Sequence, residues 1–271
     1  MTTVAEAFAR AGEDDRAALI GYLPAGFPTR EGSVRLMSAM VRGGVDVVEV
    51  GLPYSDPLMD GPVIQEAVGI ALREGTTPAD VVEIAGEVAR TGAATLVMSY
   101  WNPIERFGAA RFADSLAAAG GCGVITPDLT PEEAQEWQEA AEACDIDRIF
   151  LVAPSSTDER IRRVADSCSG FVYAASTMGV TGARATVSDA AEDLVARVRR
   201  ATALPVAVGL GVSTGDQAAQ IAAYADGVIV GSAFIRLVLE APDLPAAEAA
   251  VEGLARELSA GVRRRRDTAL S

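Results

Sequence analysis

The 271-residue sequence predicts an α/β fold, a single-domain (β/α)8 TIM barrel over residues 1–271, on the basis of three observations. Eight short β-type runs are separated by segments of helical periodicity, which is typical of parallel βαβ units. Capping residues mark the starts of several of these helices. No linker or shift in composition divides the chain, and eight such units in a chain of this length favour a closed barrel over an open sheet. The predicted strands cover residues 18–23, 45–51, 95–100, 123–126, 148–153, 170–175, 205–209 and 227–230.

Turn-forming residues predict where four of the helices begin. Thr77 and Thr130 are each followed by a proline at the first helical position and by an acid three residues after the threonine, which predicts a capped helix start. Thr214 opens the segment 217–224 in a similar way. Gly61-Pro62 predicts a helix soon after the second strand, so that the chain runs strand, loop, helix.

The composition excludes several classes of function. A formal net charge of −15 argues against a surface for nucleic acid or for an anionic membrane. No apolar run is long enough to cross a membrane, and residues 1–6 lack the pattern of a signal peptide, so we expect a cytoplasmic protein. Cys122, Cys144 and Cys168 lie far apart in a chain without histidine, which predicts neither a disulfide framework nor a metal site.

The residue types that are missing also narrow the chemistry. Without histidine, Ser-His-Asp and Cys-His catalysis are excluded, and without lysine a Schiff-base mechanism is excluded. Acid–base chemistry therefore has to come from Glu, Asp or Tyr.

Two acidic residues near the second strand are the strongest candidates for that chemistry. Glu49 interrupts the apolar run of this strand, where loss of hydration favours the protonated carboxyl and raises its pKa. Asp60 follows on a loop stiffened by Pro53 and Pro57. Structural interpretations remain open beside the functional one: Asp60 as a helix N-cap, and Glu49 in an ion pair with an arginine.

Glycine-bearing segments follow the last three predicted strands. They are residues 179–182, Gly209-Leu210-Gly211, and Gly231-Ser232. Glycine lets backbone N–H groups approach phosphate oxygens, and in barrels of this type a phosphate site is often built after strands seven and eight. Each segment could also be an ordinary turn, but three on adjacent strands favour a phosphate site.

With these residues in place, the chain resembles the α subunit of tryptophan synthase along essentially its whole length. The resemblance is carried by Glu49 with the segment 53–62, and by residues 179–182, 209–211 and 231–232, in that family's order and spacing. Residues 22–26 and Asn102-Pro103 are also similar to that family. Tyr22 and Leu210 stand where phenylalanine is common, and both remain apolar enough to line a pocket for indole.

The resemblance implies cleavage of indole-3-glycerol phosphate to indole and glyceraldehyde 3-phosphate, a lyase reaction of L-tryptophan biosynthesis. By position, Glu49 corresponds to the acid–base that protonates indole C3, and Asp60 to the carboxylate that holds the indole N–H. Tyr173 matches a tyrosine near the same site, and a half-buried strand aromatic is its alternative role. The phosphate-binding positions are Gly182, Gly211, Gly231 and Ser232, and the indole pocket comprises Tyr22, Ile64, Tyr100, Leu210 and Ile229.

The same resemblance implies a partner, a pyridoxal-phosphate-dependent β subunit that consumes indole in an α2β2 heterotetramer. No cofactor is expected in this chain itself. The loop 54–60 is the expected contact, since it joins the catalytic acids to the surface. Three alternatives stay open: a lyase that releases free indole without a partner, another phosphate-binding barrel such as a sugar-phosphate isomerase, and a catalytically silent barrel that only activates a partner.

Overall fold

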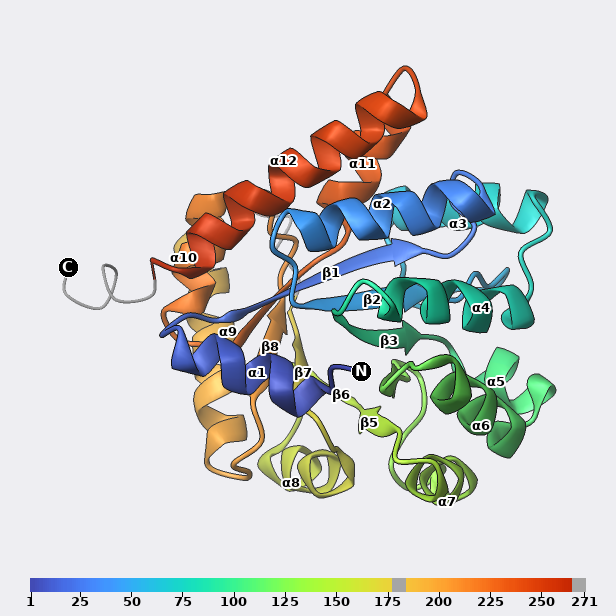
Figure 1. Cartoon of the computed structure of the whole chain (residues 1–271). Coiled ribbons are helices and arrows are strands. Elements are labelled where there is room, and N and C mark those ends of the chain that lie inside the picture. The colour runs from blue at the N-terminus through green and yellow to red at the C-terminus, as the bar shows by residue number, and fades with distance from the viewer. Residues whose placement is uncertain (177–183, 265–271) are drawn as a thin grey trace.

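The computed structural model describes residues 1–176 and 184–264. Within these ranges, nine strands form one sheet in which every pairing is parallel, and helices surround it (Figure 1). The strands are β1 (Ala18–Pro24), β2 (Val47–Gly51), β3 (Ala94–Met98), β4 (Gly123–Ile125), β5 (Asp147–Ile149), β6 (Leu151–Val152), β7 (Val172–Ala175), β8 (Val206–Gly209) and β9 (Gly227–Val230). The helices are α1 (Val4–Glu13), α2 (Arg30–Arg42), α3 (Pro62–Arg73), α4 (Pro78–Ala89), α5 (Trp101–Phe107), α6 (Ala109–Ala119), α7 (Gln135–Ala143), α8 (Asp158–Ser167), α9 (Arg184–Arg199), α10 (Gly215–Ala222), α11 (Ser232–Glu240) and α12 (Leu244–Val262).

The predicted barrel is confirmed, with one strand divided in two. The fifth predicted strand, 148–153, consists of β5 and β6, which are separated by Phe150. The Phe150 N–H donates to Cys168 Sγ at 3.4 Å instead of to a neighbouring strand. β5 pairs with β4 while β6 pairs with β7, so the continuous chain through Phe150 joins the two ends of the sheet. The ends of the other seven strands lie within two residues of their predicted positions.

Alternation along the strands separates the barrel interior from the shell under the helices. Ile20, Val47 and Leu96 belong to the inner cluster of buried side chains, whereas Leu19 and Val48 belong to the outer one. Helix α1 adds Val4, Ala7, Phe8 and Ala11 to the inner cluster. It therefore closes the N-terminal end of the barrel, and the opposite end, where the strands finish, is left for a site.

Two of the three helix starts predicted from a capping threonine agree with the structure. Thr77 forms a capping box with Asp80 at the start of α4, and Thr214 caps α10, as predicted. The start predicted at Thr130 is wrong, because α7 begins at Gln135. The Thr130 hydroxyl donates to the Glu133 carboxylate at 3.0 Å, and the Glu133 N–H donates to the Thr130 carbonyl, so the segment closes a tight turn before the helix.

Two glycines of α12 are expected to respond in opposite directions to alanine. Gly253 lies in the interior of the helix with open space around its Cα, so Gly253→Ala should raise the free energy of unfolding by about 1 kcal/mol through helix propensity. A Cβ at Gly261 would collide with the Gly215 carbonyl oxygen of α10. Gly261→Ala should therefore lower the free energy of unfolding by about 1–3 kcal/mol. Urea denaturation of the two variants measures both effects, and equal shifts would contradict this packing.

Candidate functional site

A cavity of 590 Å³ lies at the C-terminal ends of the strands. This is the end at which barrels of this type carry their catalytic groups. The lining comes from both halves of the chain: Tyr22, Glu49, Met59, Asp60, Ile64, Met98, Leu151, Ala153, Pro154, Ser155, Tyr173, Ala175, Ser176, Gly209, Leu210, Gly211, Ile229, Gly231 and Ser232. Polar groups gather at two places within an otherwise apolar wall, so the cavity suits an amphipathic ligand.

Glu49 stands inside the barrel with no exposed surface. Its strand is hydrogen-bonded on both sides, with Tyr22 and Leu96 as register neighbours. Neither carboxyl oxygen has a hydrogen-bond partner among the described residues, so the ion pair with an arginine is not found there. Burial raises the pKa of Glu49 to about 8, because the charged form loses its hydration. The carboxyl is consequently protonated at neutral pH and can act as an acid.

Asp60 reaches the same cavity from the loop between β2 and α3. The Tyr100 hydroxyl donates to Asp60 Oδ1 at 3.0 Å, and burial raises the pKa of Asp60 against the effect of this hydrogen bond. The interpretation of Asp60 as an N-cap is wrong, because Gly61 occupies the N-cap of α3 and no side chain caps that helix. The Asp60 side chain is thus available to a ligand.

Tyr22 of β1 and Tyr173 of β7 both line the cavity. Burial, followed by the charges of Asp60 and Glu49, raises the pKa of Tyr22 well above its ordinary value. Burial and the Glu49 charge likewise raise the pKa of Tyr173. Both phenols therefore stay neutral, as hydrogen-bonding groups or apolar walls rather than bases.

The other polar end of the cavity is built from backbone. Gly231 is the N-cap of α11, and Ser232 is the first residue of that helix. Gly211 has a φ of 71°, a left-handed conformation that favours glycine. A helix N-terminus with glycines and a hydroxyl beside it is suited to an anion such as phosphate. Gly182, the fourth predicted phosphate position, lies outside the described residues.

The predicted apolar wall is largely found in place. Tyr22, Ile64, Leu210 and Ile229 line the cavity, whereas Tyr100 lies behind Asp60 and does not. Sequence reasoning missed several apolar residues of the wall, with Met98 and Leu151 among them. Met98 could have been found from alternation, because it lies two residues after Leu96 on the inner face of β3.

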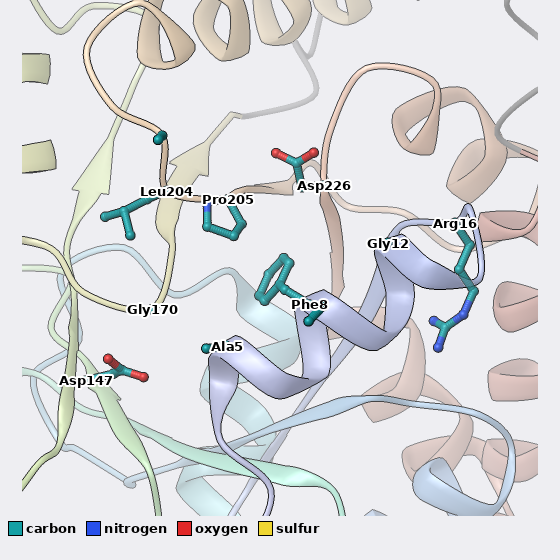
Figure 2. Close-up of a pocket in the computed structure, with 11 residues that line it drawn as sticks. Ala5, Phe8, Gly12, Arg16, Asp147, Gly170, Leu204, Pro205 and Asp226 are labelled. Atoms are coloured by element: carbon teal, nitrogen blue, oxygen red, sulfur yellow. The ribbon is translucent and has the colours of Figure 1, made fainter.

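A second cavity, of 480 Å³, lies at the opposite end of the barrel. Figure 2 shows that α1 presents Ala5, Phe8 and Gly12 to it. Two charged groups of its lining form ion pairs: Arg16 bonds to Asp46 at 2.6 and 2.9 Å, and Asp226 pairs with Arg199 at 2.8 Å. Because the C-terminal ends of the strands lie at the other end of the barrel, this cavity is not the candidate site.

No helix in the described part of the chain combines the length and the apolar character that a membrane span requires.

Comparison with known proteins agrees with the geometry. The family model of the tryptophan synthase alpha chain matches residues 8–263. The tryptophan synthase alpha chain of Thermobifida fusca (strain YX) is 58% identical over 97% of this chain and 98% of its own length. That of Mycobacteroides abscessus is 58% identical over 96% and 97%.

Solved structures give the same result. A chain in the structure of Mycobacterium tuberculosis tryptophan synthase has a TM-score of 0.88 and 52% identity, and the match covers 97% of this chain and 99% of that one. Tryptophan synthase subunit alpha from Legionella pneumophila str. Paris has a TM-score of 0.87 at 30% identity, over 97% and 98%. Since these matches span nearly the whole sequence, the chain belongs to the tryptophan synthase alpha chain family.

Proposed function

We propose that the chain carries out its family's reaction, cleavage of indole-3-glycerol phosphate to indole and glyceraldehyde 3-phosphate, in the cavity that contains Glu49 and Asp60. The observation that carries the assignment of residues is the Glu49 carboxyl, fully buried and without a hydrogen-bond partner among the described residues. An uncompensated buried carboxyl costs stability, which is typical of a group kept for function. Its high pKa suits a proton donor at neutral pH.

The proposed steps follow from the positions of the groups. Glu49 transfers its proton to indole C3, and the ring acquires a positive charge. The Asp60 carboxylate accepts a hydrogen bond from the indole N–H and stabilises that charge. Glu49 then takes the proton of the side-chain hydroxyl, the carbon–carbon bond breaks, and its electrons return to the ring. Glyceraldehyde 3-phosphate leaves as the aldehyde, and Glu49 ends the cycle protonated.

The two ends of the cavity fit the two ends of this substrate. Gly211, Gly231 and Ser232 would hold the phosphate at the start of α11. Gly182, outside the described residues, is the fourth phosphate position that the family resemblance implies. The apolar wall of Ile64, Leu210, Ile229 and Tyr22 would enclose the indole ring. Tyr173 would contribute a neutral hydroxyl beside Glu49.

We further propose that a pyridoxal-phosphate-dependent β subunit receives the indole in an α2β2 heterotetramer, and that this chain binds no cofactor of its own. The loop 54–60 is the proposed contact. It exposes two large apolar side chains, Leu58 at 76% and Met59 at 52%. Since Met59 and Asp60 are adjacent, a partner that binds Met59 would change the position of the catalytic carboxylate directly.

We also propose that residues 1–271 form one domain, which the single sheet that joins β1 to β9 supports. The chain is proposed to work in the cytoplasm, because a phosphate monoester does not cross a lipid bilayer unaided and has to meet the enzyme in the compartment where it is made.

The decisive experiment measures cleavage of indole-3-glycerol phosphate by the purified chain, with and without a cognate β subunit, by following indole or tryptophan. Slow turnover alone that rises steeply with β is the expected result. Fast turnover alone, unchanged by β, would identify a lyase that works without a partner. No cleavage in either condition would overturn the proposed reaction and leave a barrel that only binds phosphate.

A further inference from the structure

The Tyr100 hydroxyl makes two hydrogen bonds to the loop between β2 and α3, which a purely apolar pocket residue would not make. Tyr100 is the N-cap residue of α5, two residues after the end of β3, and its side chain is buried. The hydroxyl donates to Asp60 Oδ1 at 3.0 Å and accepts a hydrogen bond from the Met59 N–H at 3.1 Å. One phenol therefore fixes both the catalytic carboxylate and the backbone next to it.

Apart from Tyr100, the described residues hold the backbone of Asp60 rather than its carboxylate: the Gln65 side-chain amide donates to the Asp60 carbonyl at 2.7 Å. Among the described residues, Tyr100 supplies the one hydrogen bond made to the Asp60 carboxylate. No helix or strand is formed between β2 and α3, and Leu58 and Met59 face solvent. An exposed, irregular segment of this kind is expected to move unless a contact restrains it.

Tyr100 itself is held from both sides. The Ser99 N–H donates to the Ile125 carbonyl at 3.0 Å, which continues the sheet. The Trp101 N–H donates to both carboxylate oxygens of Asp128, at 2.9 and 3.2 Å. The Tyr100 ring packs against that of Tyr54, with centroids 5.5 Å apart. The hydroxyl is thus presented to Asp60 from a firm base.

We propose that Tyr100 is the positioning residue for Asp60, acting through its hydroxyl rather than as part of the pocket wall. The inference rests on the proposed function of Asp60. Removing the hydroxyl frees the carboxylate to leave the position where it meets the indole N–H, and it also removes a hydrogen bond that favours the ionised form.

The pKa values of the groups around Asp60 allow its protonation to be followed in the pH dependence of the rate. Burial raises the pKa of Tyr100 to about 12, so it remains a donor wherever the enzyme works. Tyr22 and Tyr173 also have raised pKa values and stay neutral. Among the described residues of the cavity lining, Glu49 is the remaining titratable group, and it has to be protonated at the start of the reaction. Loss of activity on the acidic side therefore reports the protonation of Asp60.

The test is Tyr100→Phe, which keeps the ring and deletes the hydroxyl. We expect kcat/KM to fall on the order of tenfold, mainly through kcat, and the acidic limb of the pH profile to move to higher pH. Tyr224→Phe is the matched control, because Tyr224 follows α10 and does not line the cavity. It should keep the wild-type rate and profile.

A double-mutant cycle with Asp60→Asn separates positioning from packing. If Tyr100 acts through Asp60, adding Tyr100→Phe to Asp60→Asn should cause little further loss. Additive losses, or an unchanged pH profile in Tyr100→Phe, would overturn the inference. An inactive wild-type chain would instead refute the proposed function, and NMR titration of the Asp60 carboxyl in wild type and Tyr100→Phe would then test the contact without turnover.

Discussion

Glu49→Gln is expected to abolish nearly all cleavage of indole-3-glycerol phosphate while leaving the barrel folded. The amide fills the same space on β2 but cannot deliver a proton to indole C3 or take one from the hydroxyl. General acid–base groups contribute on the order of 10²–10⁴-fold, and here one residue serves both transfers, so a loss near the upper end follows. Single-turnover assays with excess enzyme, beside circular dichroism of the same sample, measure the effect. Near-normal turnover would remove Glu49 from the mechanism.

The same substitution should alter how stability depends on pH. Below about pH 4.5 the carboxyl is protonated in both the folded and the unfolded chain, so its burial carries no ionisation penalty. Between pH 4.5 and about 8 the unfolded chain releases this proton and the folded one retains it, so wild-type stability falls by about 1.4 kcal/mol per pH unit from this group. The glutamine variant lacks this decline. The free energy of unfolding of the variant, measured by urea denaturation, should therefore increase relative to that of the wild type between pH 4.5 and about 8, and the difference should then level off. A difference that stays constant with pH would show that Glu49 ionises normally.

Asp60→Asn is expected to cause the second largest loss, on the order of 10²–10³-fold in kcat, the range found when one preorganised electrostatic contact is removed. The amide keeps the size of the side chain but removes the negative charge opposite the cationic ring. Because the charge forms only during the reaction, KM should change less than kcat. Steady-state kinetics of the isolated chain give both constants.

Asp147→Asn provides the control for Asp60→Asn. Asp147 is also a partly buried carboxyl, and burial raises its pKa, but it lies beside α1 at the other end of the barrel. It should retain wild-type kinetics. Equal losses in the two variants would mean that a missing buried charge, not the position of Asp60, reduces the rate.

Much of the fold could be predicted because local signals and barrel geometry agree. The apolar runs gave the strand positions, and Thr77 and Thr214 marked true helix starts. Thr130 failed because its side chain bonds to the Glu133 carboxylate rather than to a helix N–H, and sequence alone does not separate the two. The break at Phe150 depends on Cys168, eighteen residues away, so no local pattern could show it.

The site divides in the same way. Glu49 was identifiable as a candidate because a carboxyl in an apolar strand is costly, and the glycines after β8 and β9 predicted the polar backbone end of the cavity, where Gly211 and Gly231 are found. The roles around Asp60 were not identifiable, since the contact with Tyr100 joins segments forty residues apart. Spacing allowed an N-cap for Asp60, and the family resemblance implied a wall position for Tyr100; the folded arrangement replaces both.

The two carboxyls belong to backbone segments that differ in rigidity. Glu49 sits in a strand bonded on both sides, whereas Asp60 sits on an irregular segment, and among the described residues its carboxylate accepts a hydrogen bond from Tyr100 alone. In the proposed mechanism the proton donor is fixed and the anion is adjustable. A contact with residues 54–60 can therefore change the reaction rate by moving Asp60, without moving Glu49. Substitutions on the surface of this one loop would then be enough for evolution to set the activity of the isolated chain, while proton transfer by Glu49 stays the same.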